Sequence, residues 1–329
     1  MPLPLKASSI NGLFALLFAA TIIIAPAFAF QDDKPIKLKT DLVVIDVTVT
    51  DKNGNFIRNL KADDFVVYED NEPQKIDFFE ASEQAALTRP LAVVFALDTS
   101  GSIKPEEVNK QREAAENFMK LVQPDSVFAV LAFSNDTRVL QDFTNDARKI
   151  SQAFQRLGEV GGSSKIFGSI DRAISMLKRA PRFRGGRRLR RVVIVISDGF
   201  DNMTSPDQTD MIRRANDAEV TVYSITLPSY MPGLGSNQRV MTLLDVSRVV
   251  PMTGGADFSA DTKDFAPVFK AIAEEIRSSY TVAYYPSEKS RASSGVHQLR
   301  VEVKQSGAIV RASRTSYQTT KNATADGHR

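Results

Sequence analysis

The apolar positions of the chain follow two patterns, and each predicts a different kind of structure. In residues 37–80, short runs of β-branched and aromatic residues are separated by turn sequences such as Asp51-Lys52-Asn53-Gly54-Asn55, which predicts strands joined by tight turns. In residues 90–278, continuous apolar runs alternate with segments of helical periodicity, as expected for a parallel sheet buried on both faces. From residue 279 onward, short strands separated by polar turns are expected again.

The central region is expected to form a doubly wound α/β domain with a mostly parallel sheet. Buried strands are predicted at 91–97, 126–133, 192–196 and 220–227, an edge strand at 138–143 and a short last strand at 256–258. Helices are predicted at 105–122, 147–157, 166–177, 207–218, 240–250 and 262–278. The last helix leads into the following strand without a glycine or proline linker. A displacement of that helix is therefore expected to move the strand as well.

The flanking segments contain too few strands for two separate domains. Strands are predicted at 42–50, 65–68 and 76–79, with a turn at 70–73, and again at 280–285, 298–303 and 309–312. Three short strands bury little apolar area, whereas the ends of an α/β domain can lie close together. We therefore expect both segments to pair into one small β-sandwich, with the α/β domain inserted between them.

This organisation predicts five regions along the chain. They are an N-terminal targeting segment at 1–29, a β segment at 30–86, the α/β domain at 88–278, a second β segment at 279–317 and a disordered tail at 318–329. The polar composition of the last residues is the reason for expecting disorder there.

Composition narrows the chemistry. The chain has 329 residues, of which 43% are hydrophobic, and a formal net charge of only +3, which argues against a nucleic-acid binder. Without any cysteine, the chain cannot form disulfides, thiolate metal sites or cysteine nucleophiles. Only His297 and His328 are present, both near the C-terminus, so neither a serine–histidine triad nor a histidine-ligated metal site is expected.

The N-terminus has the features of a secretory signal. Lys6 is followed by an apolar run from residue 12 to 25, then by Pro26 and the small-x-small sequence Ala27-Phe28-Ala29. This pattern predicts cleavage after Ala29 and a periplasmic or secreted protein. The alternative is an uncleaved N-terminal membrane anchor, since residues 12–29 nearly reach the length that spans a bilayer.

The strongest local signal is Asp98-Thr99-Ser100-Gly101-Ser102, which directly follows the first buried strand. Ligands of open α/β sheets bind at the carboxyl ends of the strands. The segment offers one carboxylate and two hydroxyls there, and such oxygen donors suit Mg²⁺, Mn²⁺ or Ca²⁺. Ser197-Asp198-Gly199 and Gly161-Gly162-Ser163-Ser164 are expected at the same edge, so three loops could converge on one cation. The alternative for Asp98, Ser100 and Ser102 is an ordinary strand-to-helix turn with capping residues.

These segments resemble the metal-ion-dependent adhesion site of von Willebrand factor A domains. Asp98-Thr99-Ser100-Gly101-Ser102 matches its Asp-x-Ser-x-Ser element, residues 162–167 are similar to the segment with its threonine ligand, and Asp198 matches its last aspartate. Thr253-Gly254-Gly255 resembles the Thr-Gly-Gly before the last strand of many members. The resemblance covers roughly residues 88–278. The flanks are more weakly similar to those of bacterial proteins with a von Willebrand factor A-related domain.

The resemblance implies that Asp98, Ser100, Ser102, Ser164 and Asp198 hold a divalent cation, Mg²⁺ or alternatively Mn²⁺ or Ca²⁺. Ser164 stands where the family usually has threonine, and the neighbouring Ser163 is the alternative ligand. A cation held partly by hydroxyls keeps strong Lewis acidity and takes an Asp or Glu of a protein partner as a further ligand. The implied function is therefore adhesion or protein binding, not enzymatic catalysis.

Two rival functions use the same segments. A metal-dependent hydrolase would need a general base near the cation, for which Asp201 is the only spare nearby acid. A structural envelope protein would leave the site empty, and metal titration separates it from the others.

The stretch from Lys178 to Arg191 contains eight basic residues among fourteen. It could contact an anionic surface of the envelope, or it could be a solvated connection before the strand at Val192. The second interpretation is favoured because Phe183 is the only aromatic residue in the stretch.

The first testable prediction concerns export. Because signal peptidase cleaves after a small-x-small sequence, exported material should begin with Phe30-Gln31-Asp32. N-terminal sequencing of that material is the measurement. A sequence that starts at Met1 or Pro2 would identify an uncleaved anchor instead.

Overall fold

The computed structural model describes residues 42–81, 89–100, 105–157, 161–162, 164–198, 207–227, 248–260 and 264–319. All of them fall within one compact unit, Asp41–Arg329. The targeting segment with Ala29, the candidate ligand Ser102, the alternative ligand Ser163, Asp201 and most of the helix expected at 240–250 lie outside the described residues. Among the described helices, none has the length and apolar character needed to cross a membrane.

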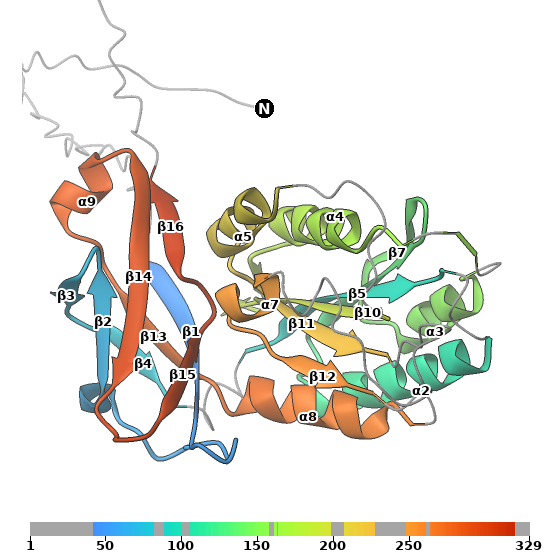
Figure 1. Cartoon of the computed structure of the whole chain (residues 1–329), viewed down its shortest axis with the longest axis horizontal. Coiled ribbons are helices and arrows are strands. Elements are labelled where there is room, and N and C mark those ends of the chain that lie inside the picture. Colours follow the sequence, from blue (N-terminus) through green and yellow to red (C-terminus); the bar gives the residue numbers. More distant parts are fainter. Residues whose placement is uncertain are drawn as a thin grey trace, which may run out of the picture. The chain divides into compact units, whose positions relative to one another are not determined.

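The α/β part is built on a six-stranded sheet in the order β12-β11-β10-β5-β6-β7 (Figure 1). Its strands are β5 (Leu91–Asp98), β6 (Val127–Phe133), β7 (Thr137–Thr144), β10 (Arg190–Ser197), β11 (Val220–Thr226) and β12 (Asp257–Ser259). All neighbours pair in parallel except β6 and β7, which are antiparallel. The predicted doubly wound, mostly parallel sheet is confirmed.

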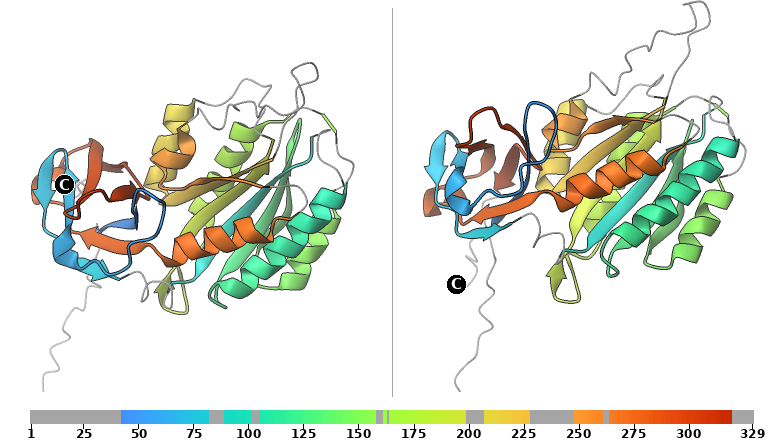
Figure 2. Two further views of the ribbon diagram at one scale, coloured as in Figure 1. Left: turned by 60° about the horizontal axis from the view of Figure 1, so that its bottom comes forward. Right: turned by 90° about the horizontal axis from the view of Figure 1, so that it is seen from below.

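Helices cover both faces of this sheet (Figure 2). One face carries α2 (Pro105–Leu121), α3 (Ala147–Gln155) and α8 (Ala266–Arg277), and the other carries α4 (Ile166–Arg179), α5 (Gln208–Asp217) and α7 (Val249–Met252). Because side chains of a strand alternate in direction, Phe95 packs into the first core and its neighbour Val94 into the second. Both faces are buried, which explains why the sequence shows continuous apolar runs.

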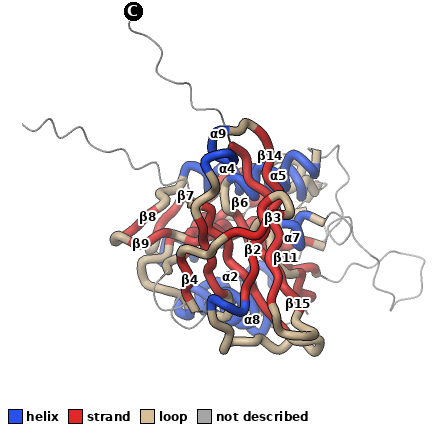
Figure 3. The backbone as a smooth tube through the Cα atoms, turned by 90° about the vertical axis from the view of Figure 1, so that its left-hand side faces the viewer, coloured by secondary structure: helices blue, strands red, loops and turns tan. Residues whose placement is uncertain are grey.

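The flanking strands form two four-stranded sheets, in the orders β15-β1-β13-β4 and β16-β14-β2-β3. Figure 3 shows β2, β3 and β14 of the second sheet in the foreground. The N-terminal strands are β1 (Val43–Thr50), β2 (Phe65–Glu69), β3 (Glu72–Gln74) and β4 (Phe78–Glu80), and the C-terminal strands are β13 (Tyr280–Tyr284), β14 (Gly295–Val303), β15 (Ile309–Ala312) and β16 (Ser316–Thr319).

Each sheet combines strands from both segments. β1 pairs with β13 and β15, and β2 pairs with β14. One apolar core, with Ile45, Val67 and Tyr280 among its fully buried side chains, lies between the sheets. The sandwich formed by the N- and C-terminal segments is therefore confirmed, whereas the domain boundaries stay predictions.

Several local expectations were wrong. The turn expected at 70–73 is shorter, because Asp70 and Asn71 with φ of 51° and 70° form it and β3 begins at Glu72. Adjacent residues with positive φ are typical of two-residue hairpin turns. At the C-terminal end, Gln318 and Thr319 belong to β16 and pair with β14, although they were assigned to the disordered tail. The short helix α9 (Glu288–Ala292), which Ser287 caps, was not expected.

The basic stretch at 178–191 is not one surface patch. A two-stranded hairpin, β8 (Phe183–Arg184) and β9 (Arg187–Arg188), turns at Gly185-Gly186, both with positive φ. Arg190 and Arg191 begin β10 and are buried, and Arg191 donates a hydrogen bond to Ala218 O at 2.9 Å. These two arginines are therefore part of the fold, and only the remaining basic residues can form an outer surface.

A buried carboxylate joins the sandwich to the α/β part. Asp46 in β1 forms ion pairs with Arg89, just before β5, and with Arg190 in β10, and it accepts a hydrogen bond from the Thr281 hydroxyl at 2.8 Å. Although burial raises it, the charges of Arg89 and Arg190 hold the pKa of Asp46 below its usual value. The two arginines and the carboxylate compensate one another's burial.

The second prediction follows from this cluster. Asp46→Asn should lower the free energy of unfolding by about 3–5 kcal/mol at neutral pH, because it removes the carboxylate that pairs with the buried Arg190 and with the partly buried Arg89. A carboxyl with a depressed folded-state pKa stabilises the fold above its unfolded pKa and loses that effect in acid. The difference between wild type and Asp46→Asn should therefore shrink as the pH falls through the folded-state pKa.

Urea unfolding across pH measures this difference. Asp142→Asn, at an exposed carboxylate on the edge strand β7, is the control and should behave as wild type. Equal unfolding free energies for Asp46→Asn and wild type at neutral pH would contradict the prediction.

Candidate metal centre

Asp98 is the last residue of β5, and the pairing of this strand determines where its carboxylate lies. β5 runs between β6 and β10, with Asp98 beside Phe133 and Leu97 beside Ile196. This register places Ser197, the last residue of β10, next to Asp98 at the carboxyl edge of the sheet. The Asp98 side chain is buried there, with 2% of its residue surface exposed.

Among the described residues, Ser164, Ser197 and Ser100 donate hydrogen bonds to the Asp98 carboxylate. The hydroxyls of Ser164 and Ser197 both donate to Oδ2 at 2.6 Å, and the backbone N–H of Ser100 donates to Oδ1 at 2.7 Å. These donors come from three different strand ends or loops of the α/β part. The convergence expected from the sequence is thus present for the loops that carry Asp98, Ser164 and Ser197.

Backbone contacts hold the loops in this arrangement. Thr99 N–H donates to Phe133 O at 2.8 Å, and Gly161 N–H donates to Thr99 O at 2.8 Å. On the other side of the loop, Lys165 N–H donates to Ser134 O at 3.2 Å, just before α4 begins. Ser164 is therefore fixed between the end of β6 and the first turn of α4, although it lies 66 positions after Asp98 in the sequence.

Gly162 is required by this packing. Its φ of +88° suits glycine, and a Cβ there would lie 2.6 Å from Asn135 Nδ2. The glycine at position 162 thus reflects a close approach between this loop and the β6–β7 turn.

The electrostatics of Asp98 favour a bound cation. Burial raises the pKa of its carboxyl, and the hydrogen bonds from Ser164, Ser197 and Ser100 lower it only in part. Within the described part of the chain, no cationic side chain contributes to this balance. A buried carboxylate without a counter-charge, surrounded by hydroxyl oxygens, is a donor set that fits a hard divalent cation.

The predicted site residues lie as follows. Asp98 and Ser164 are in direct contact, and Ser100 is buried beside them. Asp198 directly follows β10 and is partly buried. Whether these residues coordinate a metal stays a prediction, as does the choice between Ser164 and Ser163.

Sequence reasoning missed Ser197 as part of the site. Its hydroxyl is fully buried and contacts the same carboxylate oxygen as Ser164. The signal was present, because parallel strands that end together bring their last residues side by side. Only the register between β5 and β10 shows that Ser197, and not its neighbour Asp198, stands directly beside Asp98.

Comparison with known proteins identifies the α/β part. Residues 92–251 match the family model of the von Willebrand factor type A domain. The match agrees with the doubly wound sheet and with the place of Asp98 at a strand end. The chain therefore carries a von Willebrand factor type A domain. No curated protein matches the chain.

Several solved structures are similar at low sequence identity. An aerotolerance-related membrane protein from Bacteroides fragilis is 16% identical, with 56% of this chain and 98% of that chain covered and a TM-score of 0.43. A von Willebrand factor type A structure from Catenulispora acidiphila is 13% identical, covering 84% of this chain and 74% of that chain, with a TM-score of 0.47. Proximal thread matrix protein 1 from the mussel byssus, with a zinc-occupied MIDAS motif, is 14% identical, covering 57% of this chain and 48% of that chain, with a TM-score of 0.47.

The third prediction tests whether Asp98 binds a cation. In chelator, Asp98→Asn should be at least as stable as wild type, because the amide removes a buried charge. Mg²⁺ at about 100 times its dissociation constant should stabilise wild type by about 2.7 kcal/mol and leave Asp98→Asn unchanged. Thermal unfolding with chelator and with excess Mg²⁺ measures both effects.

Asp142→Asn is the matched control, since it removes an exposed carboxylate from the same domain. It should keep the full stabilisation by Mg²⁺. An equal gain for Asp98→Asn would place the cation elsewhere.

Proposed function

We propose that this protein is an exported binding module that captures an acidic side chain of a protein partner through a divalent cation. The cation would be held by Asp98, Ser100, Ser102, Ser164 and Asp198. The observation that supports this most directly is the buried Asp98 carboxylate, which has no cationic partner among the described residues and has two hydroxyls directed at it. Mg²⁺ is the preferred ion, with Mn²⁺ and Ca²⁺ as alternatives.

The chain's own residues would prepare the site before a partner arrives. Ser197 holds one oxygen of Asp98, and the backbone of Ser100 holds the other. Because these groups are fixed by the sheet and its loops, little ordering is left for the moment of binding. When bound, the cation would supply a coordination position that an oxygen of a partner's carboxylate can occupy.

Binding is favoured over catalysis because the described residues of the site offer no evident general base. His297 lies in β14 of the sandwich and forms its contacts there, and His328 and Asp201 lie outside the described residues. A hydrolase needs a group that activates water beside the metal. The rival hydrolase would require such a group from the loop at 199–206.

Export fits this function. Metal-dependent capture of a protein partner outside the cytoplasm is consistent with the signal sequence expected at residues 1–29. The exposed basic residues Lys178, Arg179, Arg182 and Arg187 would add a contact to an anionic envelope surface. Periplasmic and secreted forms are both compatible with this proposal.

The fourth prediction tests partner capture. Immobilised wild-type protein should retain a partner from envelope extract in Mg²⁺ and release it in chelator, because the partner's carboxylate binds only through the cation. Asp98→Asn should retain at least tenfold less, whereas Asp142→Asn should retain as much as wild type. Quantitative mass spectrometry of the retained proteins is the readout.

Two outcomes would count against the proposal. Retention that is the same with Mg²⁺ and chelator would show binding that does not use the cation. Turnover of an ester or phosphoester substrate by wild type and not by Asp98→Asn would favour the hydrolase.

A further inference from the structure

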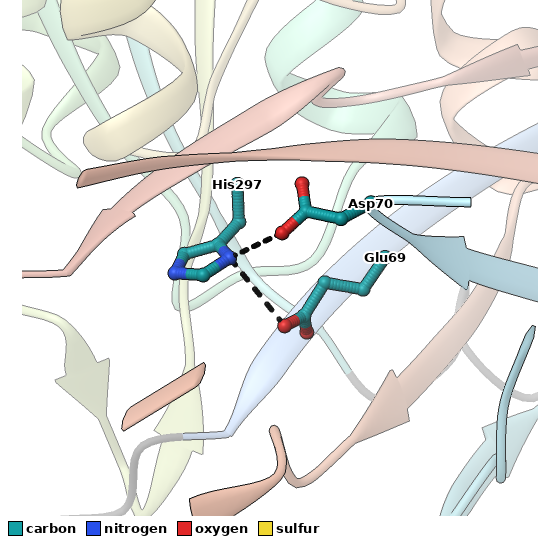
Figure 4. Close-up of side chains that lie close together, drawn as sticks. All are labelled: Glu69, Asp70 and His297. Carbon is teal, nitrogen blue, oxygen red and sulfur yellow. Dashed lines mark hydrogen bonds and ion pairs between the residues drawn. The ribbon is translucent and has the colours of Figure 1, made fainter. Parts of the chain in front are cut away.

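A second group of metal-ligand side chains lies in the sandwich and not in the α/β domain. Glu69 is the last residue of β2, Asp70 begins the hairpin turn to β3, and His297 lies in the neighbouring strand β14 (Figure 4). His297 Nδ1 lies 2.7 Å from Asp70 Oδ2 and 3.6 Å from Glu69 Oε1. One donor atom from each residue falls within a common 4.8 Å.

The hydrogen-bond pattern assigns the tautomer of His297. Ser293 Oγ donates its proton to Ser290 O at 2.7 Å, so toward His297 Nε2, at 2.8 Å, it can act only as an acceptor. Nε2 therefore carries a hydrogen. In a neutral imidazole the other nitrogen then has a free lone pair, and that nitrogen, Nδ1, faces both carboxylates. A metal ion placed there would be ligated by this lone pair and by one oxygen of each carboxylate.

Each carboxylate is also held by a separate contact. Tyr284 donates its phenol hydrogen to Glu69 Oε2 at 2.6 Å, and the backbone N–H of Gln298 donates to Asp70 Oδ1 at 2.8 Å. The remaining oxygens, Glu69 Oε1 and Asp70 Oδ2, are the ones that face His297. Such outer contacts orient metal ligands and raise affinity.

The charge balance also calls for a cation. Glu69 is only 2% exposed, and a buried carboxylate requires a positive partner. Of the cationic side chains that the structure describes, His297 is the one paired with Glu69 and Asp70.

Tyr317 provides an independent observation. Its ring stacks on His297 with centroids 5.1 Å apart, and the residue is 7% exposed. Its hydroxyl has no hydrogen-bond partner among the described residues. A buried, unpartnered hydroxyl beside a carboxylate–histidine pair is a free oxygen donor for an ion placed there.

We propose that Glu69, Asp70 and His297 form a second divalent-cation site, which takes a borderline ion such as Zn²⁺. One imidazole nitrogen with two carboxylate oxygens is a donor set that suits zinc better than Mg²⁺. Donor atoms about 2.0–2.1 Å from a tetrahedral zinc lie about 3.3 Å apart. The separations of 2.7 and 3.6 Å at Nδ1 bracket that value, so a small shift of the half-exposed Asp70 side chain would admit the ion.

The ion would join parts of the sandwich that are far apart in sequence. It would tie the β2–β3 turn to β14, and through Ser293 and Thr319, both within 3.3 Å of His297 Nε2, to the end of α9 and to β16. Metal binding that needs the folded arrangement stabilises the fold. The site would therefore fasten the C-terminal strands to the N-terminal hairpin.

The test uses the full chain with Asp98→Asn in the background, so that it does not depend on the candidate metal centre of the α/β domain. His328→Gln is added to remove the other histidine. This protein should bind one equivalent of Zn²⁺ by calorimetry, and its unfolding temperature should rise with Zn²⁺. Adding Asp70→Asn should weaken Zn²⁺ binding at least tenfold, because asparagine keeps the turn but loses the anionic ligand.

Asp51→Asn is the matched control. Asp51 also accepts backbone hydrogen bonds within a turn of the sandwich, but among the described residues it is not part of a cluster of metal-ligand side chains. It should leave Zn²⁺ affinity unchanged. Nitrogen-15 NMR of the imidazole adds a second readout, in which Zn²⁺ should shift Nδ1 of His297 while Nε2 stays protonated.

Absence of Zn²⁺ uptake in the Asp98→Asn background would overturn the proposal and leave Glu69, Asp70 and His297 as a cluster of hydrogen-bonded side chains. Uptake that Asp70→Asn does not weaken would also overturn it. Loss of uptake in Asp70→Asn alone, with Asp51→Asn unaffected, supports it.

Discussion

The antiparallel pairing of β1 with β13 is the constraint on which the rest of the molecule depends. It brings Val43–Val47 beside Tyr280–Tyr284 and thereby fixes where the α/β domain leaves and rejoins the sandwich. The buried Asp46 in this pairing also forms ion pairs with Arg89, just before β5, and with Arg190, the first residue of β10. The sandwich and the inserted domain therefore share one charged cluster. A shift of either part at this junction would leave a buried charge unpaired or expose it to solvent.

A second junction between the sandwich and the inserted domain depends on close approach of their backbones and not on charge. A Cβ on Gly255 would lie 1.9 Å from Val222 O, and one on Gly254 would lie 2.4 Å from Ala312 O in β15. Arg311 in the same strand donates to Gly255 O at 2.7 Å. The Thr-Gly-Gly segment that resembles the family thus has a physical role, because it lets β11 and the sandwich approach the same turn. At the end of α8, the hydroxyls of Ser279 and Thr48 lie 3.0 Å apart, which adds a third contact.

The sequence predicted most of the fold, since strands buried on both faces produce apolar runs that few other structures share. It also indicated the edge of the sheet at which Asp98 lies, because a carboxylate after such a run lies where open sheets bind ligands. What it could not supply was register. Ser197 joins Asp98 only through the alignment of β10 with β5, and β3 begins earlier than expected because Asp70 and Asn71 complete the turn alone.

The histidine cluster shows the same limit more clearly. His297 was set aside because its position near the C-terminus suggested no metal ligands around it. The fold places it against Asp70, 227 positions earlier in the sequence, through the pairing of β14 with β2. No local pattern in the sequence can reveal a contact that depends on which strands of two distant segments become neighbours.

The inserted arrangement also determines how the molecule would carry mechanical load. β1 and β16 lie in different sheets of the sandwich, so tension applied between these strands acts first on the packing of one sheet against the other. The α/β domain branches off between β4 and β13 and stays outside this path for as long as the sandwich holds. A partner held at the carboxyl edge of the sheet would transmit force along another route. That force would reach the sandwich through the chain before β5, where Arg89 lies, and through α8, which precedes β13. These two connections join the α/β domain to β4 and β13, which are paired with each other. The sandwich would then serve as a mechanical base, and the binding domain would be shielded from forces on its flanks.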